Sequence, residues 1–229
     1  FKQKTAYEIM PSLVGSEMCI RDRKIMGVHD FSINPKRENL QNKEKPSETE
    51  VLEAIKTLLR WTGDNPERDG LKDTPKRVLK AYSEWFGGYN EDPKSLLSKT
   101  FEEVKGYNDW VTLDSIRVES YCEHHLAPII GVAKVGYLPN GLVVGISKLV
   151  RVVNAYSKRL QIQERLTREI ALAIQETLNP KAVAVAIKAE HHCMCTRGVN
   201  KPGTKMLTSS FIGEAEKNLE FRRSFLEMD

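Results

Sequence analysis

The change of hydrophobic period after Trp110 restricts the possible folds of this chain more than any other feature. Between Trp110 and Pro139 apolar and polar residues alternate and β-branched residues are frequent, as in VTLDSIRVES and IIGVAKVGYLP, which predicts two antiparallel strands. Helical spacing follows, and the segments AVAVAIKAE and KMLTSSFIG then return to a strand-like composition. This order predicts one α+β domain.

Two amphipathic helices are expected between the strand pairs. Ser147 is predicted to cap the helix KLVRVVNAYSKRL. In QIQERLTREIALAIQETLNP the apolar residues recur every four positions until Asn179-Pro180 ends the pattern. A final helix is expected from Glu214 to Met228.

Two further helices are predicted nearer the N-terminus. Ser47 and Glu50 have the spacing of a capping box, and the helix that they begin should end near Gly63. Thr74 is predicted to cap a second helix, with Pro75 in its first position and Gly87-Gly88 at its end. We therefore divide residues 48–229 into a helical extension, 48–108, and an α+β part, 109–229, which contains the predicted strands.

Residues 1–47 show no comparable pattern and are expected to be a disordered or artefactual leader. The stretch SEMCIRDR resembles the translation of a sequencing-library adapter, so the residues before about Lys24 are interpreted as a read-through artefact and Cys19 is discounted. A genuine disordered leader is the alternative. Residues 24–47 are polar and predicted to be flexible.

Composition excludes several classes of protein. The 229 residues are 40% apolar and 29% charged, which allows a sizeable core. No stretch approaches the ~18 consecutive apolar residues of a membrane-spanning helix, so no membrane partner is expected. The net charge of +4 does not indicate nucleic acid. The 4 cysteines are too few for a disulfide scaffold, which favours a cytoplasmic location.

The spacing of cysteine and histidine predicts a metal site. Cys122 and His125 form a CxxH pair in SYCEHHLAP, and Cys193 in EHHCMCTRG offers a third ligand. Three protein ligands would leave one zinc position open for water, as in catalytic sites. Two alternatives remain open at this stage. Cys195 could close the site as a fourth ligand, or Cys122 and Cys193 could form a disulfide if the metal is lost.

Two further histidines accompany these ligands. His124 and His191 are not needed to hold the metal, and imidazole is well matched to proton transfer near neutral pH. The alternative is that each is a hydrogen-bonded histidine of the core.

Polar clusters suggest an anionic substrate. Lys148 and Arg151 follow the expected cap, and Arg197 follows the second ligand segment, which together would suit a polyphosphate. Gln163 and Glu164 could bind the amino and amide edge of guanine. The alternatives are solvated surface cations and an acidic first helical turn that favours the helix dipole.

At this point the residues match a known family. The stretch ESYCEHHLAPIIGVAKVGYLPNGLVVGISKLVRVVNAYSKRLQIQERLT, with EHHCMCTRGV and TSSFIG after it, resembles GTP cyclohydrolase I from about Thr49 to the C-terminus. The resemblance implies the following roles: zinc ligands Cys122, His125 and Cys193; catalytic His124 and His191; a guanine anchor at Glu164 helped by Gln163; triphosphate contacts at Lys148, Arg151, Arg197 and, from a neighbouring subunit, Arg77; and Ser147 in opening of the ribose.

The resemblance also implies a fold and an assembly. The family has the tunnelling fold, or T-fold, in which an antiparallel sheet backed by helices assembles into a barrel. The expected state is a homodecamer with active sites between subunits.

The implied reaction is hydrolysis of GTP. The guanine ring opens at the carbon between its two imidazole nitrogens, formate leaves, and the ribose rearranges to give 7,8-dihydroneopterin triphosphate, the first step toward folates and pterins. Two alternatives are a non-catalytic zinc module closed by Cys195 and a pterin-binding relative of the same fold without ring-opening activity.

Overall fold

The computed structural model of this chain describes residues 45–102 and 107–227. The predictions for the leader up to residue 44, for Cys19 and for Met228 lie outside these ranges. Within them, no helix is long and apolar enough to cross a membrane.

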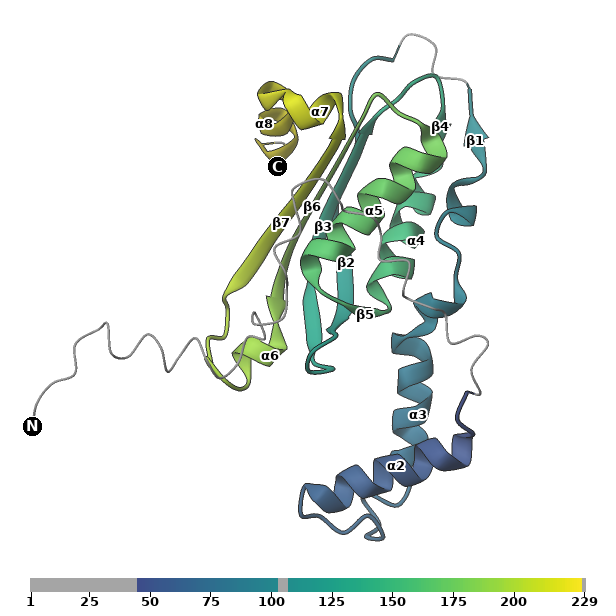
Figure 1. Ribbon diagram of the computed structural model, residues 1–229, viewed down its shortest axis with the longest axis vertical. Helices are drawn as coiled ribbons and strands as arrows, with labels where there is room; N and C mark the ends of the chain where they lie inside the picture. Colours follow the sequence, from purple (N-terminus) through teal and green to yellow (C-terminus); the bar gives the residue numbers. More distant parts are fainter. Residues whose placement is uncertain (1–44, 103–106, 228–229) are drawn as a thin grey trace, which may run out of the picture. The chain divides into compact units, whose positions relative to one another are not determined.

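The centre of the molecule is a five-stranded sheet (Figure 1). Its order is β5 (Leu160–Gln161), β2 (Val111–Cys122), β3 (Pro128–Leu138), β6 (Ala182–His191) and β7 (Lys205–Gly213). The pairs β2–β3, β3–β6 and β6–β7 are antiparallel, and only the short β5 pairs in parallel, with β2. The prediction of two antiparallel strands between Trp110 and Pro139 is confirmed. A second, two-stranded sheet pairs β1 (Thr100–Phe101) with β4 (Val143–Val144).

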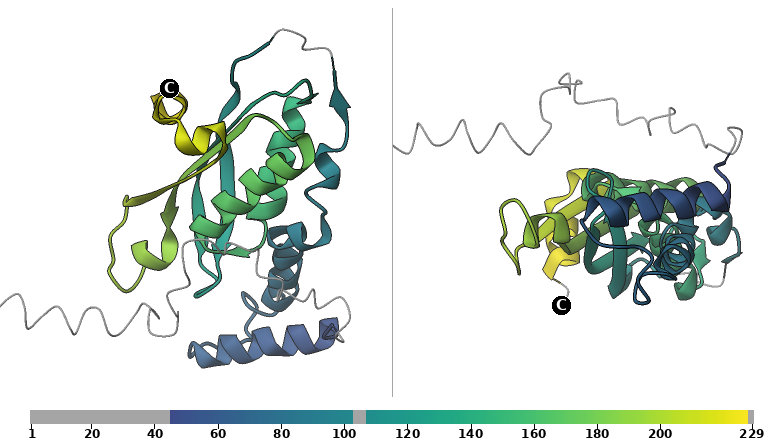
Figure 2. Two further views of the ribbon diagram at one scale, coloured as in Figure 1. Left: turned by 45° about the horizontal axis from the view of Figure 1, so that its top comes forward. Right: turned by 90° about the horizontal axis from the view of Figure 1, so that it is seen from below.

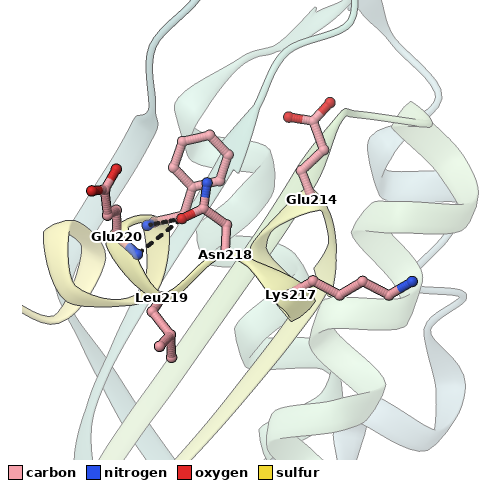
Figure 3. A pocket seen from close by; sticks show the side chains of 6 residues that line it. Glu214, Lys217, Asn218, Leu219 and Glu220 are labelled. Carbon is pink, nitrogen blue, oxygen red and sulfur yellow. Dashed lines mark hydrogen bonds between the residues drawn. The ribbon is translucent and has the colours of Figure 1, made fainter.

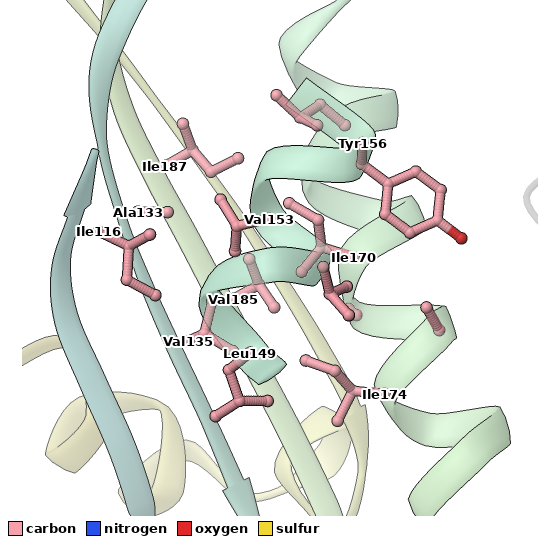
Figure 4. Close-up of a cluster of buried hydrophobic side chains, with 14 of the residues drawn as sticks. Ile116, Ala133, Val135, Leu149, Val153, Tyr156, Ile170, Ile174, Val185 and Ile187 are labelled. Atoms are coloured by element: carbon pink, nitrogen blue, oxygen red, sulfur yellow. The ribbon is translucent and has the colours of Figure 1, made fainter. Parts of the chain in front are cut away.

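Helices α4 (Ile146–Ser157) and α5 (Gln163–Leu178) cover one face of the five-stranded sheet (Figures 1 and 2). Between helices and sheet lies a core of aliphatic side chains, several of them fully buried (Figure 4). Strand β6, which lies between β3 and β7, contributes Val183, Val185 and Ile187 to this core. Ala184 and Ala186 of the same strand pack instead with Phe225 of α8. Because β6 is covered on both faces, its sequence is a continuous apolar run.

The C-terminal segment differs from the prediction of one helix. It forms α7 (Glu214–Lys217) and α8 (Leu219–Glu227), separated at Asn218, whose backbone is extended. The Asn218 side-chain oxygen accepts hydrogen bonds from the backbone N–H groups of Glu220 at 2.9 Å and Phe221 at 3.3 Å (Figure 3). Asparagine side chains compete with the helical ladder in this way, so Asn218 ends one helix and begins the next.

The first N-terminal helix forms as predicted. Helix α2 (Glu48–Trp61) carries the capping box: the Glu50 N–H donates to Ser47 Oγ at 3.3 Å and the Ser47 N–H donates to Glu50 Oε2 at 2.8 Å. Gly63, with a positive φ of 90°, follows its end.

Two predicted caps are wrong. In α3 (Thr74–Trp85) the N-cap is Asp73, which makes no side-chain capping bond, and Thr74 is already helical. In α4 the N-cap is Gly145, again without a side-chain cap, so Ser147 is also inside its helix. Short 3₁₀ turns, Gly87–Asn90 and Ser95–Leu97, follow α3. The predicted end of α5 is confirmed, with Asn179 in the left-handed conformation.

Gly131 provides a test of the sheet packing. A Cβ atom at this position would lie 2.2 Å from the carbonyl oxygen of Lys188 and 2.5 Å from Cα of Ala189, both on the neighbouring strand β6. We expect Gly131→Ala to lower the free energy of unfolding by about 1–3 kcal/mol, measured by urea denaturation. The matched control is Gly87→Ala, where a Cβ would meet nothing within 4 Å. Equal denaturation midpoints for the two variants would contradict this packing.

Candidate metal and catalytic site

The topology of the sheet brings two distant segments together. Strands β2 and β6 both run antiparallel to β3, which lies between them, so β2 and β6 finish at the same end of the sheet. Cys122 is the last residue of β2, and His191 is the last residue of β6. Neighbouring strands are about 4.8 Å apart, so the ends of β2 and β6 lie about 10 Å from each other. Side chains from the two following turns can therefore meet over the start of β3.

Three metal-ligating side chains do meet there. The donor atoms of Cys122, His125 and Cys193 all lie within 4.8 Å of one another. The distance from Cys122 Sγ to His125 Nδ1 is 3.7 Å. Tetrahedral zinc with ordinary Zn–S and Zn–N bond lengths would hold this sulfur and nitrogen about 3.6 Å apart. The donor set and its spacing therefore fit zinc.

A tight turn holds the first two of these donors. The Cys122 N–H donates to the Ala127 carbonyl at 2.8 Å, and the Leu126 N–H donates to the Cys122 carbonyl at 2.9 Å. Leu126 adopts a positive φ of 55°, which is uncommon for a residue other than glycine. Cys193 comes from the short helix α6 (His192–Cys195) directly after β6.

The electrostatics of the cluster favour a cation. Burial, together with the neighbouring Cys122, raises the pKa of Cys193 to about 11. Cys122 and Cys193 are free thiols, so the structure does not contain the disulfide considered above. A divalent cation between two thiols supplies the positive charge that their thiolate forms require.

Cys195 does not belong to this group of donors. Its side chain is buried, and its thiol is hydrogen-bonded to the carboxylate of Glu190 instead. The expectation that Cys195 could close the site as a fourth ligand is therefore not supported by the structure.

His191 is half-buried and bonded to Gln163, the first residue of α5. Its Nε2 lies 2.8 Å from Gln163 Oε1. The Gln163 amide nitrogen donates to the carbonyls of Ile187 and Met206 and to the hydroxyl of Thr208, at 2.9–3.0 Å. Since the amide nitrogen has these acceptors, its oxygen must face His191, and Nε2 of His191 carries the hydrogen. Nδ1 is then the basic nitrogen, and burial lowers the pKa of the ring.

This arrangement changes the interpretation of the Gln163-Glu164 pair. Gln163 was expected to assist in binding guanine, but its side chain is fully buried and all its polar atoms bond within the protein. Glu164 is exposed, and its charge acts on the His191 ring. Only the Glu164 side chain is available to a ligand at this point of the chain.

His124 lies on the outer side of the cluster. Its side chain is 54% exposed, and its Nδ1 is 3.8 Å from Cys122 Sγ. It is not one of the three clustered donors. The imidazole is thus beside the proposed metal position and accessible to a ligand.

A network of polar side chains, not predicted from the sequence, supports the turn after β2 that carries Glu123. Arg165 donates to Glu123 and, at 3.0 Å, to the amide oxygen of Gln161. Gln161 in turn donates to Glu169 at 2.8 Å, and both of these side chains are buried. The network joins the metal-site loop to the first turns of α5. The signal available in the sequence was Glu169, a charged residue within the apolar pattern of a helix.

The proposed phosphate contacts divide into two groups. Arg197 is close enough for its charge to act on Cys193. Ser147, Lys148 and Arg151 are in the first turns of α4, which begins beside Tyr137, where the Val144 N–H donates to the Tyr137 hydroxyl. Tyr137 is at the other end of β3, and the 11 residues of this strand span about 33 Å. Helix α4 then runs back toward the metal end, where Ser120 Oγ donates to the Arg159 carbonyl at 3.5 Å. Arg151 is eight residues, or about 12 Å of helix, before Arg159, so Lys148 and Arg151 lie at the end of α4 that is away from the cluster.

Arg77 is also separate from the cluster within one chain. It is exposed on α3, and its guanidinium donates to the Gly70 carbonyl at 3.1 Å and to the Thr74 hydroxyl at 2.9 Å. The other end of α3 approaches the metal end of the sheet, where Trp85 stacks on Tyr121 with ring centroids 5.2 Å apart. Arg77 is eight residues, or about 12 Å of helix, before Trp85.

The family model for GTP cyclohydrolase I matches residues 51–229. The chain belongs to the GTP cyclohydrolase I family. It is 53% identical over 184 residues to GTP cyclohydrolase 1 of Maricaulis maris (strain MCS10), covering 80% of this chain and 90% of that protein. It is 52% identical over 182 residues to GTP cyclohydrolase 1 of Pelagibacter ubique (strain HTCC1062), with coverages of 80% and 90%.

Among solved structures, the apo form of the archaeosine synthase QueF-Like matches with a TM-score of 0.38 and 23% identity. The match covers 45% of this chain and 93% of that chain. This TM-score is too low to bear on the fold.

The position of Cys195 leads to a prediction about metal content. Cys195→Ala should retain as much zinc as the unchanged protein, because its thiol is bonded to Glu190 rather than to the cluster. Zinc per chain after dialysis, measured by atomic emission, is the readout. Cys193→Ala is the matched comparison and should lose the metal. Equal loss in both variants would show that Cys195 is a ligand.

Proposed function

We propose that this enzyme hydrolyses GTP to 7,8-dihydroneopterin triphosphate and formate, with one zinc ion held by Cys122, His125 and Cys193. The observation that carries the proposal is the group of three clustered donors, with His124 beside Cys122 and His191 two residues before Cys193. A ligand set of three leaves a coordination position for water. When bound, zinc lowers the pKa of such a water to about 7.

The two histidines are proposed to transfer protons. His191 is oriented by Gln163 so that Nδ1 can take up a proton and return it during ring opening. His124, exposed beside Cys122, would serve the same purpose. Both would transfer protons as the guanine ring opens and formate leaves.

Glu164 is the proposed guanine anchor. Its carboxylate is exposed at the start of α5, near His191. A carboxylate accepts two hydrogen bonds side by side, which suits the amino group and ring N–H of guanine. In this proposal Gln163 acts on His191 and not on the base.

The phosphate site is proposed to be shared between copies of the chain. Lys148 and Arg151 lie in the first turns of α4, and Arg151 is eight residues, or about 12 Å of helix, before Arg159, which contacts Ser120 near the metal end. A neighbouring copy would bring them, with Ser147, to Arg197 and the cluster. Arg77 would come from a neighbouring copy as well. We propose a homo-oligomer built as a T-fold barrel, with ten subunits, in which the edge strands β5 and β7 are covered by partners.

The proposed context is the first step of tetrahydrofolate and pterin biosynthesis in the cytoplasm. No nucleic-acid or membrane partner is proposed.

The separate roles of ligand and proton carrier can be tested with two variants. Cys122→Ser should lose both zinc and formate release, because it removes a ligand. His124→Ala should retain zinc but lose about 100-fold or more in kcat, the usual contribution of a general acid–base group. Metal analysis and a formate assay with GTP are the measurements, and His192→Ala, which alters a neighbouring histidine outside the donor group, is the control. Loss of zinc from the His124 variant would mean that the ligand is misassigned.

A shared site predicts complementation between inactive chains. Neither His124→Ala nor Arg151→Ala should turn over GTP alone, but co-refolding them in equal amounts should restore about a quarter of the sites, since some would combine two unaltered halves. Pterin fluorescence measures the recovery. Mixing two preparations of His124→Ala is the control. No recovery from the true mixture would show that each chain contains its whole site.

A further inference from the structure

The connection between β6 and β7 carries two of the proposed functional residues, Cys193 and Arg197. It leaves the sheet after His191 and returns at Lys205. Glu190 and Lys205 form the last residue pair of the two strands, so Glu190 lies close to both the first and the last residues of the connection.

Glu190 is bonded to both halves of this connection. Its Oε1 accepts a hydrogen bond from the Gly203 N–H, near the end, at 3.1 Å. Its carboxylate also accepts a hydrogen bond from the buried thiol of Cys195, near the start. Hydrogen bonds to a carboxylate are stronger than those between neutral groups. One side chain therefore joins the two ends of the loop.

The residues between these two contacts form a compact turn. The Asn200 N–H donates to the Arg197 carbonyl and the Lys201 N–H donates to the Met194 carbonyl, both at 3.1 Å. Gly198 and Asn200 have positive φ angles of 60° and 50°. Arg197 thus lies at the base of a turn whose ends are fixed by Glu190.

Glu190 has no direct place in the proposed chemistry. It is not among the clustered metal donors, and its carboxylate is occupied by bonds within the protein. Its effect on a ligand must therefore pass through the loop. A loop that is already ordered before binding loses less conformational entropy when it captures an anion.

We propose that Glu190 is a positioning residue, which braces the β6–β7 connection through Cys195 and Gly203 and so fixes Arg197 for binding the triphosphate of the substrate. This role rests on the proposed function for the identity of the substrate. The chemistry recognised is a linear polyphosphate.

Inorganic tripolyphosphate is the probe that separates this role from catalysis. Glu190→Ala should weaken its binding, measured by calorimetry on the full-length zinc protein, and should raise KM for GTP, each by about tenfold, the effect of one lost bond to a charged group. The value of kcat and the zinc content should stay near those of the unchanged protein. Glu190→Gln keeps an acceptor for both donors and should restore most of the affinity. Loss of zinc with unchanged affinity for tripolyphosphate would overturn the proposal.

A double-variant comparison tests the route through Arg197. If Glu190 acts by placing Arg197, then Glu190→Ala combined with Arg197→Ala should bind tripolyphosphate no more weakly than Arg197→Ala alone. Effects that multiply would show that Glu190 acts independently and would overturn the proposal. The control for the change in net charge is Glu119→Ala, which removes an exposed carboxylate on β2 that is paired with Arg117 of the same strand. This variant should bind tripolyphosphate as tightly as the unchanged protein.

Failure of the proposed enzymatic function and failure of the positioning role of Glu190 give different results. An unchanged protein that binds tripolyphosphate but releases no formate from GTP would contradict the proposed function, and the calorimetric test of Glu190 would still apply. Equal tripolyphosphate affinity in the unchanged protein and in Glu190→Ala would contradict the positioning role of Glu190, whatever the turnover.

Discussion

The meeting of two cysteine side chains at one end of the sheet is the constraint on which the rest of the site depends. Cys122 ends β2 and Cys193 follows the end of β6, and they can meet because β3 runs between these two strands in the opposite direction. Without a cation, the half-buried Cys193 resists ionisation because its charged form would be desolvated and would lie beside the other sulfur. A divalent metal bound here would offset the repulsion between the two thiolates. Metal binding at this site would for that reason be coupled to folding.

Local signals in the sequence predicted those parts of the fold that depend on local interactions. The capping box of Ser47 and Glu50 and the left-handed end of α5 at Asn179 each involve residues a few positions apart. The caps at Thr74 and Ser147 were wrong because the N-cap positions are Asp73 and Gly145, one and two residues earlier, and neither makes a side-chain capping bond. The break at Asn218 was missed because an asparagine inside a helical stretch carries no unambiguous signal.

The clustering of the three metal-ligating side chains was predictable from the sequence, whereas the arrangement of the proposed phosphate contacts was not. A CxxH pair and a later cysteine indicate shared ligation because few other roles need that spacing. The grouping of Lys148 and Arg151 with Arg197 required the direction of α4 relative to the sheet, which a linear pattern does not contain. The partners of Cys195 and Gln163 depend on which strands are neighbours. In both cases tertiary contacts, between Cys195 and Glu190 and between Gln163 and His191, decide the role.

The start of α5 combines these constraints in three consecutive residues. Gln163 turns inward and bonds to β6 and β7, while Arg165 reaches the opposite way to Glu123 in the loop after β2. Glu164, between them, is the one that is left exposed. Because both neighbours are fixed to the two segments that carry the metal-ligating side chains, the backbone of Glu164 has little freedom to move relative to the cluster. In the proposed role of guanine anchor, Glu164 would gain specificity from this fixation, since the position of its backbone is set before the ligand binds.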